Sequence, residues 1–149
     1  MTSSKILIEA SADEVRKVLF DIASYPTWSR SIKGAKVETS DDQGRPLRIQ
    51  LTIEAGMLRD KPTLDYDWSG APGKVSFTLV DADLLTKMDG TYFVKSIGDE
   101  TEVTYELSTD VSMPIPKTML ETAELGTIKA ALEELKEKSK VNVELFKFN

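Results

Sequence analysis

Between residues 32 and 111 of this 149-residue chain, apolar and polar side chains alternate in one segment after another. The period of two is clear at 47–53, 64–68, 75–79 and 103–107. Strands of this kind have one apolar and one polar face, which is typical of an antiparallel sheet with one side in water. Sequences rich in Gly, Asp and Pro separate the segments, so we expect neighbouring strands to form hairpins.

The Gly98-Asp99 pair predicts the register of the last hairpin. If these two residues form its loop, Tyr92 lies opposite Tyr105, because residues an equal number of steps from the loop face each other. On the preceding hairpin, setting Leu79 opposite Met88 places Phe77 opposite Gly90. Apolar residues then meet apolar residues or Gly, and four successive strands share one face rich in Tyr, Phe and Met.

Two short helices are expected between the first strand, at about 5–9, and the rest of the sheet. Ser11 and Glu14 have the spacing of a capping box, and apolar residues follow at helical intervals. This helix is predicted to end near Pro26, because the residue before a proline avoids helical angles. Pro26 is then suited to the first turn of a second short helix that runs through Trp28.

A long helix is predicted from about Lys117 to Lys140, with Pro116 as its first residue. Its apolar side chains form two stripes: Leu120, Ala123, Thr127 and Ala131 in one, and Leu125, Ile128, Leu132 and Leu135 in the other. Gly126 lies inside this helix, where glycine is unfavourable. Close approach to a neighbouring element is the leading explanation, with a hinge or a tolerated exposed position as alternatives. Residues 141–149 are left unassigned.

One helix cannot cover the apolar face of seven strands. A helix with its side chains is ~10 Å wide, whereas seven strands at ~4.8 Å spacing are roughly three times wider. The sheet must therefore curl around the helix, which predicts an α+β fold with a gap between the two. Such a gap is an apolar cavity suited to a small molecule.

The composition excludes several classes of chemistry. The chain has neither Cys nor His, which excludes thiol nucleophiles, Ser-His-Asp triads and His- or Cys-ligated metals, so we expect no metal and no cofactor. A net charge of −6 makes nucleic acid an unfavourable partner. No apolar segment has the length of a membrane span or signal peptide, so we expect a cytoplasmic protein of one domain, 1–149, with no stable membrane insertion.

Several motifs resemble those of one superfamily: Ile8-Glu9-Ala10, Tyr25-Pro26-Thr27-Trp28, Asp89-Gly90-Thr91-Tyr92, Thr101 to Tyr105, and Pro114-Ile115-Pro116. With the order of elements, they make the chain similar to the START/Bet v 1-like (SRPBCC) superfamily, in its polyketide cyclase/dehydrase and lipid transport branch. The resemblance covers nearly the whole chain. It implies a helix-grip fold, in which a curved seven-stranded antiparallel sheet wraps a long C-terminal helix, and a cavity for a hydrophobic ligand.

The expected ligand-binding residues combine the inward-facing strand positions with the long helix and Trp28: Trp28, Leu51, Tyr66, Trp68, Phe77, Leu79, Met88, Tyr92, Tyr105, Leu107, Met119, Leu120 and Ala123. For Trp28 a packing anchor is the preferred explanation, whereas the tyrosines are explained equally well as core. Carboxylate pairs such as Asp65/Asp67 and Asp81/Asp83 are assigned to the surface, and no catalytic residue is assigned.

Three functions are compatible with these residues. Because the inward positions carry almost no charge, the first is binding or transport of a neutral hydrophobic molecule such as a lipid, isoprenoid quinone or polyketide-like compound. The second is a polyketide cyclase or dehydratase that acts on a bound acyl chain, largely by holding it in position. The third is a macromolecular interaction module with an incidental cavity; no protein partner is identified.

Overall fold

The computed structural model describes residues 1–56 and 58–148, and the side chains among them up to residue 140. Its elements are β1 (Thr2–Ile8), α1 (Ala12–Leu19), η1 (Ile22–Thr27, a 3-10 helix), β2 (Ile32–Ser40), β3 (Pro46–Ala55), β4 (Leu58–Asp60), β5 (Thr63–Asp67), β6 (Lys74–Asp81), β7 (Leu85–Ile97), β8 (Glu100–Val111) and α2 (Lys117–Phe148). None of the helices in this part of the chain is both long and apolar enough to span a membrane.

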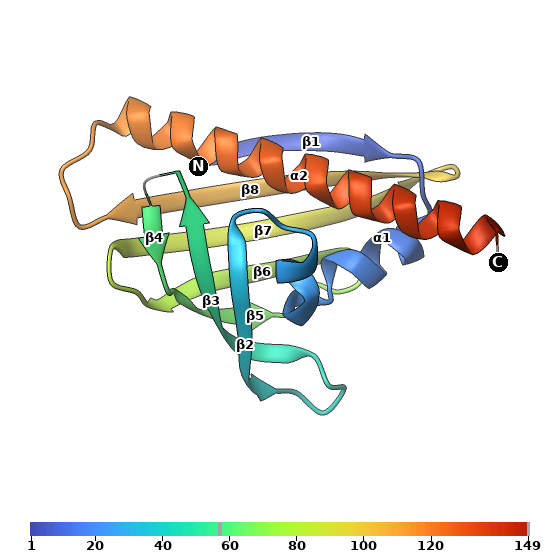
Figure 1. Cartoon of the computed structure of the whole chain (residues 1–149), viewed down its shortest axis with the longest axis horizontal. Helices are drawn as coiled ribbons and strands as arrows, with labels where there is room; N and C mark the ends of the chain where they lie inside the picture. The colour runs from blue at the N-terminus through green and yellow to red at the C-terminus, as the bar shows by residue number, and fades with distance from the viewer. Residues whose placement is uncertain (57, 149) are drawn as a thin grey trace.

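The strands form one curved antiparallel sheet in the order β1-β8-β7-β6-β5-β3-β2, and the three-residue β4 pairs with β3 at its side. Seven strands were expected, and β4 is the addition. Helix α2 crosses the sheet and packs on β1, β8 and α1, as Figure 1 shows. This is the helix-grip fold expected from the sequence.

The register expected from the hairpin loops is confirmed. Tyr92 pairs with Tyr105 and Gly90 with Leu107 across β7 and β8. Phe77 lies opposite Gly90 on β7 and opposite Tyr66 on β5. The shared apolar face therefore exists as predicted, and it forms most of the buried core.

The helix boundaries differ from the expected ones. The first helix ends at Leu19, and Pro26 lies inside η1 rather than at the start of a helix. Ser11 caps α1 as predicted, accepting a hydrogen bond from the Glu14 amide. At the other end of the chain, the Pro116 carbonyl accepts the first bonds of α2, so Pro116 precedes the helix. That helix continues to Phe148 instead of ending near residue 140.

Gly90 has a packing role on the inner face of β7. A Cβ atom added to its backbone would overlap the ring of Phe77, its partner on β6. The ring occupies the space that a side chain at position 90 would need, so glycine at this position allows Phe77 to lie flat over the sheet. Phe77 is also one of the side chains that form the cavity wall.

Gly90→Ala should therefore lower the free energy of unfolding by about 1–3 kcal/mol, the usual cost of overpacking a core. Chemical denaturation measures the change. The same substitution in a Phe77→Leu background is the control, because a smaller side chain leaves room for the new methyl group. An equal loss of stability in both backgrounds would contradict the role given to Phe77.

Gly126 does not make the close approach expected of it. A Cβ atom built on Gly126 meets no atom of a neighbouring element within 4 Å, and the residue is exposed. Close packing against the sheet or the short helices is therefore wrong as an explanation. The geometry matches the third alternative, a tolerated glycine on the solvent side of α2.

Gly126→Ala should raise the free energy of unfolding by about 0.5–1 kcal/mol, because alanine is the better helix former. The reverse exchange at the neighbouring exposed position, Ala130→Gly, should lower it by a similar amount. Thermal and denaturant unfolding of both variants test the pair. A destabilised Gly126→Ala protein would show that the solvent side of α2 is not open at this point.

Candidate functional site

A cavity of about 330 Å³ lies between α2 and the inner face of the sheet. Side chains from η1, from β2 to β8, from α2 and from the segment that leads into α2 form its wall. The wall is mainly apolar. The volume is near the lower end of the range for small-molecule sites. The sheet and α2 leave this space open for the reason anticipated from their widths: one helix fills only part of the curve.

The two apolar stripes of α2 have different roles. Leu120, Ala123, Thr127 and Ala131 all line the cavity. In the second stripe, Ile128, Leu132 and Leu135 are fully buried in the core beside α1 and β1. Helix α2 is therefore anchored along one stripe and faces the empty space with the other.

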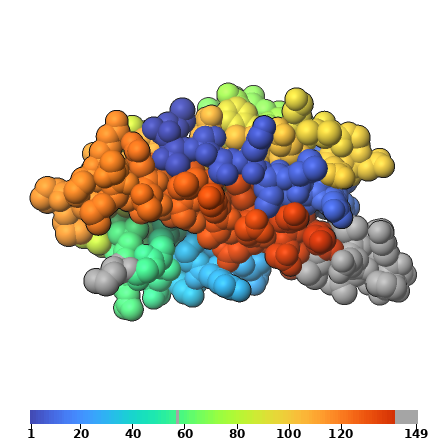
Figure 2. Space-filling view, turned by 90° about the horizontal axis from the view of Figure 1, so that it is seen from above, coloured from blue at the N-terminus to red at the C-terminus, as the bar shows by residue number. Residues whose placement is uncertain are grey.

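The cavity reaches the surface beside the N-terminal half of α2. Met113 and Ile115, in the segment that leads into the helix, line it and are 52% and 38% exposed. Ala123 and Thr127 are also lining residues that remain exposed. Figure 2 shows β1 and α1 along one flank of α2, so the seam toward β2 and β4 lies on the other flank.

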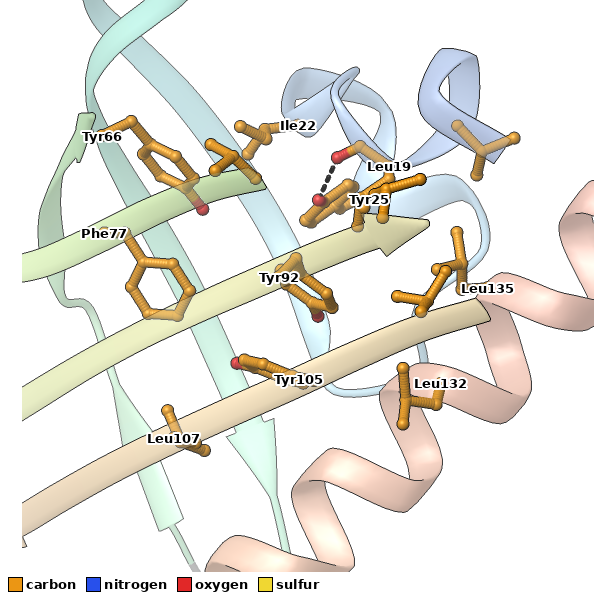
Figure 3. Packing of buried hydrophobic residues seen from close by; sticks show 14 of the residues in the cluster. Leu19, Ile22, Tyr25, Tyr66, Phe77, Tyr92, Tyr105, Leu107, Leu132 and Leu135 are labelled. Carbon is orange, nitrogen blue, oxygen red and sulfur yellow. Dashed lines mark hydrogen bonds between the residues drawn. The ribbon is translucent and has the colours of Figure 1, made fainter. Parts of the chain in front are cut away.

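The structure brings most of the expected site residues together. Nine of the thirteen line the cavity: Leu51, Tyr66, Phe77, Met88, Tyr92, Tyr105, Leu107, Leu120 and Ala123. The strand members do so because the alternation and the register put them on the inner face. Figure 3 shows Tyr66, Phe77, Tyr92 and Tyr105 projecting into one common space.

Four expected site residues lie outside the cavity wall. Met119 is 62% exposed, because the helix turns it away from the sheet. Trp28 packs edge-on against Tyr25 with ring centroids 5.0 Å apart. Trp68 is buried and donates from Nε1 to the Pro46 carbonyl at 2.6 Å, and its ring stacks on that of Tyr66. Leu79 is half-buried and packs against the core from the end of β6.

Trp28 instead borders a shallow surface groove of about 470 Å³ between the η1–β2 loop and the C-terminal half of α2. Charged side chains, including Glu133, Glu137 and Lys138, form much of its wall. The Arg30 amide donates to the Glu134 carboxylate across this groove at 2.8 Å. The groove is an open contact between loop and helix, and it differs in character from the apolar cavity.

The phenol groups of the cavity are held in their neutral form. Burial raises the pKa values of Tyr25, Tyr66, Tyr92 and Tyr105 above that of free tyrosine, because the phenolate would lose its hydration. They are therefore hydrogen-bond donors at neutral pH and not bases. The Tyr25 hydroxyl donates to the Leu19 carbonyl, which joins η1 to the end of α1 (Figure 3).

Glu124 was missed from the sequence, and it is the only Asp, Glu, Lys or Arg among the described residues that line the cavity. It is 6% exposed, and both carboxylate oxygens are occupied. Oε1 accepts from the Thr2 hydroxyl at 2.6 Å, and Oε2 accepts from the amide and hydroxyl of Thr109 at 2.5 and 2.6 Å. Its four-residue spacing from Leu120 and Ile128 was the signal that could have placed it on the inner face.

The electrostatic state of Glu124 follows from these contacts. Burial alone raises the pKa of a carboxyl group, but the bonds from Thr109 and Thr2 outweigh that effect and leave the pKa of Glu124 below its ordinary value. The group is thus a charged anchor that attaches α2 to β1 and β8. Because its oxygens already have partners, it is poorly placed to take a proton from a bound molecule.

A second buried carboxylate shapes the cavity wall from outside. Asp60, 5% exposed, accepts hydrogen bonds from the amides of Lys61, Asp83, Leu84 and Leu85 at 2.8–3.0 Å. Burial raises the pKa of Asp60, but the hydrogen bonds from these four amides lower it by more. The pKa therefore lies below its ordinary value. Asp60 thereby holds the β6–β7 loop so that Leu84 and Leu85 line the cavity.

Among the described residues, no three acidic side chains come close enough to hold a metal ion. Asp65, assigned to the surface from the sequence, forms a two-pronged ion pair with Arg48 on the neighbouring strand, with N–O distances of 2.7 and 2.9 Å. Asp67 accepts from the Ser69 amide in the turn after β5. Both carboxylates therefore have local structural partners on the outer face.

A curved antiparallel sheet, a long C-terminal helix across it and an apolar cavity between them define a helix-grip protein of the START/Bet v 1-like class. The chain belongs to the polyketide cyclase / dehydrase and lipid transport family, whose model matches residues 2–140. The sequence matches none of the curated proteins with which it was compared.

Solved structures share this fold over almost the whole chain. A START superfamily protein from Mycobacterium smegmatis has a TM-score of 0.88 at 22% identity, covering 93% of this chain and 96% of its own. A protein from Thermus thermophilus has a TM-score of 0.82 at 15% identity, with 95% and 97% covered. The Zhui aromatase/cyclase of Streptomyces sp. R1128 has a TM-score of 0.74 at 14% identity, with 95% and 94% covered.

The anchoring role of Glu124 makes a prediction about pH. Its pKa is lower in the folded than in the unfolded chain, so its contribution to stability is complete above the ordinary value of 4.5 and is lost as the pH falls through the folded value. Glu124→Gln should lower the free energy of unfolding by about 1–2 kcal/mol at pH 7, because charge-assisted hydrogen bonds become neutral ones. The difference from the wild type should shrink below pH 4.5.

Denaturant unfolding between pH 3 and pH 8 measures both effects. Glu121→Gln is the matched control on the same helix: Glu121 is exposed and meets Lys117 only at 4.0 Å. Its substitution should change stability by less than about 0.5 kcal/mol. A Glu124→Gln protein whose deficit stays constant with pH would show that the carboxylate charge is not what anchors α2.

Proposed function

We propose that this protein binds an uncharged hydrophobic small molecule in the cavity under α2. The observation that carries the proposal is a preformed, mainly apolar space of about 330 Å³ that opens beside the N-terminal half of the helix. Displacing water from such a surface favours association by roughly 25 cal/mol per Å² buried. A lipid fragment, a quinone or a polyketide-like ring system has the required chemistry.

The charges of the wall support a neutral ligand. The lining residues that the structure describes include neither Lys nor Arg, so an anionic headgroup has no counter-ion inside. The one carboxylate, Glu124, is already occupied by threonine donors and offers little to a cation. An ion that left water for this space would lose hydration without compensation.

An enzyme of the aromatase/cyclase type is the second candidate, and the similarity of the fold to solved aromatase/cyclases favours it. The wall supports it less well than simple binding. Its four phenols have raised pKa values, and its carboxylate is hydrogen-bonded three times, so a free acid or base is missing from the described wall. Any catalysis here would act by positioning a reactive chain.

Fluorescence titration with prodan, a neutral environment-sensitive dye, tests the binding proposal. We expect saturable binding that Ala131→Phe weakens at least tenfold, because the new ring enters the cavity from α2. Ala130→Phe is the matched control, since Ala130 faces the outer groove and its ring would leave the cavity open. Thermal melting of each variant verifies that it is folded, and Ala131→Leu serves if the phenylalanine overpacks the site.

Competition against the bound dye tests the neutral character of the ligand. Decanol should displace prodan at lower concentration than decanoate at pH 8, because the two share a chain and differ in charge. Absence of saturable dye binding to the wild type would refute the binding proposal. Equal binding to the Ala131→Phe and wild-type proteins would place the dye elsewhere on the surface.

A further inference from the structure

The hydroxyl groups of the cavity are not all used by the protein. Tyr25 donates to the Leu19 carbonyl, so its hydroxyl has a partner. The Tyr92 ring stacks on that of Tyr105 with centroids 4.0 Å apart, and their two hydroxyls are in contact. Within the described residues, Tyr66 and Tyr105 donate no hydrogen bond to a backbone carbonyl or a carboxylate.

Tyr66 therefore has no hydrogen-bond partner among the described residues, and Tyr105, whose oxygen accepts from Tyr92, keeps its own proton available. In the described part of the chain, Ser139 Oγ is the only side-chain polar atom that is sealed from solvent and has no partner. Both tyrosines are nearly fully buried, with 9% and 4% of their surface exposed, and both line the cavity. Their phenol oxygens differ from the Ser139 hydroxyl because the cavity itself touches them.

These two hydroxyls lie in the interior, away from the mouth. Tyr66 comes from β5 and Tyr105 from β8, with the Phe77 ring between them at centroid distances of 5.5 and 6.4 Å. Figure 3 shows both side chains directed toward the space beside the Phe77 ring. The exposed lining residues Met113 and Ile115 are at the entrance, where the chain enters α2.

A buried phenol proton without an acceptor is unfavourable by about as much as a lost hydrogen bond, so the protons of Tyr66 and Tyr105 both call for an acceptor. The Phe77 ring between them supplies none, and the Tyr92 hydroxyl already acts as a donor toward Tyr105. We propose that the Tyr66 and Tyr105 hydroxyls form a polar subsite at the inner end of the cavity, which selects ligands that carry a hydrogen-bond-accepting oxygen, such as a ketone or quinone carbonyl, and binds them oxygen first.

This inference rests on the proposed binding function and specifies the ligand class. Because the hydroxyls are donors, a carbonyl oxygen is a better partner than an alkyl end. Because the rest of the wall is apolar, the remainder of the ligand is hydrocarbon-like. The raised pKa values of both phenols keep the donor protons in place over the whole physiological range.

A pair of isosteric probes tests the subsite. 2-Acetylnaphthalene and 2-isopropenylnaphthalene have nearly the same shape, and only the first has a carbonyl oxygen in place of a methylene group. Displacement of prodan and calorimetry give the two dissociation constants, which are corrected for the partition of each probe from water into cyclohexane. We then expect the wild-type protein to prefer the ketone at least about tenfold, because the correction leaves only the hydrogen bond inside the cavity.

Tyr66→Phe and Tyr105→Phe should each reduce this preference, and the double variant should abolish it while the hydrocarbon binds at least as well as before. Ser139→Ala is the control, since it removes a buried hydroxyl that lies outside the cavity wall; the preference should persist. The infrared carbonyl band of bound 2-acetylnaphthalene should move to higher frequency in the double variant, as the hydrogen bond is lost.

The outcomes separate this inference from the function on which it rests. If the hydrocarbon binds the wild type and the double Phe variant leaves the ketone preference and the carbonyl band unchanged, the polar subsite is refuted while the cavity function stands. If neither probe nor prodan binds, both are refuted. If each Phe variant unfolds, the carbonyl band in the wild type alone decides, because an unshifted band relative to cyclohexane overturns the subsite.

Discussion

The mismatch in width between one helix and a broad sheet is the constraint on which the rest of the structure depends. A helix of ~10 Å diameter covers about two strands at ~4.8 Å spacing. Helix α2 meets β1 and β8 directly, and the sheet must curl for β5, β3 and β2 to face it at all. The cavity is the space that this curl leaves, so a binding site arises from the architecture before any particular side chain is considered.

Two buried carboxylates hold parts of the cavity wall in place. Glu124 attaches the N-terminal half of α2 to Thr2 and Thr109, although its neighbouring residues on the helix are largely exposed. Asp60 holds the β6–β7 loop through three amides that lie 23–25 residues away in sequence. Each charge is compensated by several donors, which is the condition under which a buried carboxylate is tolerated.

The hydrogen bonds that satisfy these carboxylates also affect what the cavity can bind. Because its carboxylate is fully hydrogen-bonded by the protein, the described wall leaves the hydroxyls of Tyr66 and Tyr105 among the polar groups that remain available. The wall is thus suited to recognise an oxygen atom on an otherwise apolar molecule, and its described residues include no group tuned to exchange protons at neutral pH. Within a family named for both cyclases and lipid transport, these features support the binding function proposed above.

The sequence by itself determined the strand faces, the register and the two stripes of α2, because alternation and helical spacing are local and Gly98-Asp99 set the count between strands. Nine expected site residues reached the cavity for that reason. Only the tertiary structure decided which way Met119 and Gly126 faced, that Glu124 had partners on β1 and β8, and that Asp60 was buried. Those outcomes depend on contacts between residues distant in sequence, and a residue's local pattern contains no information about a partner far along the chain.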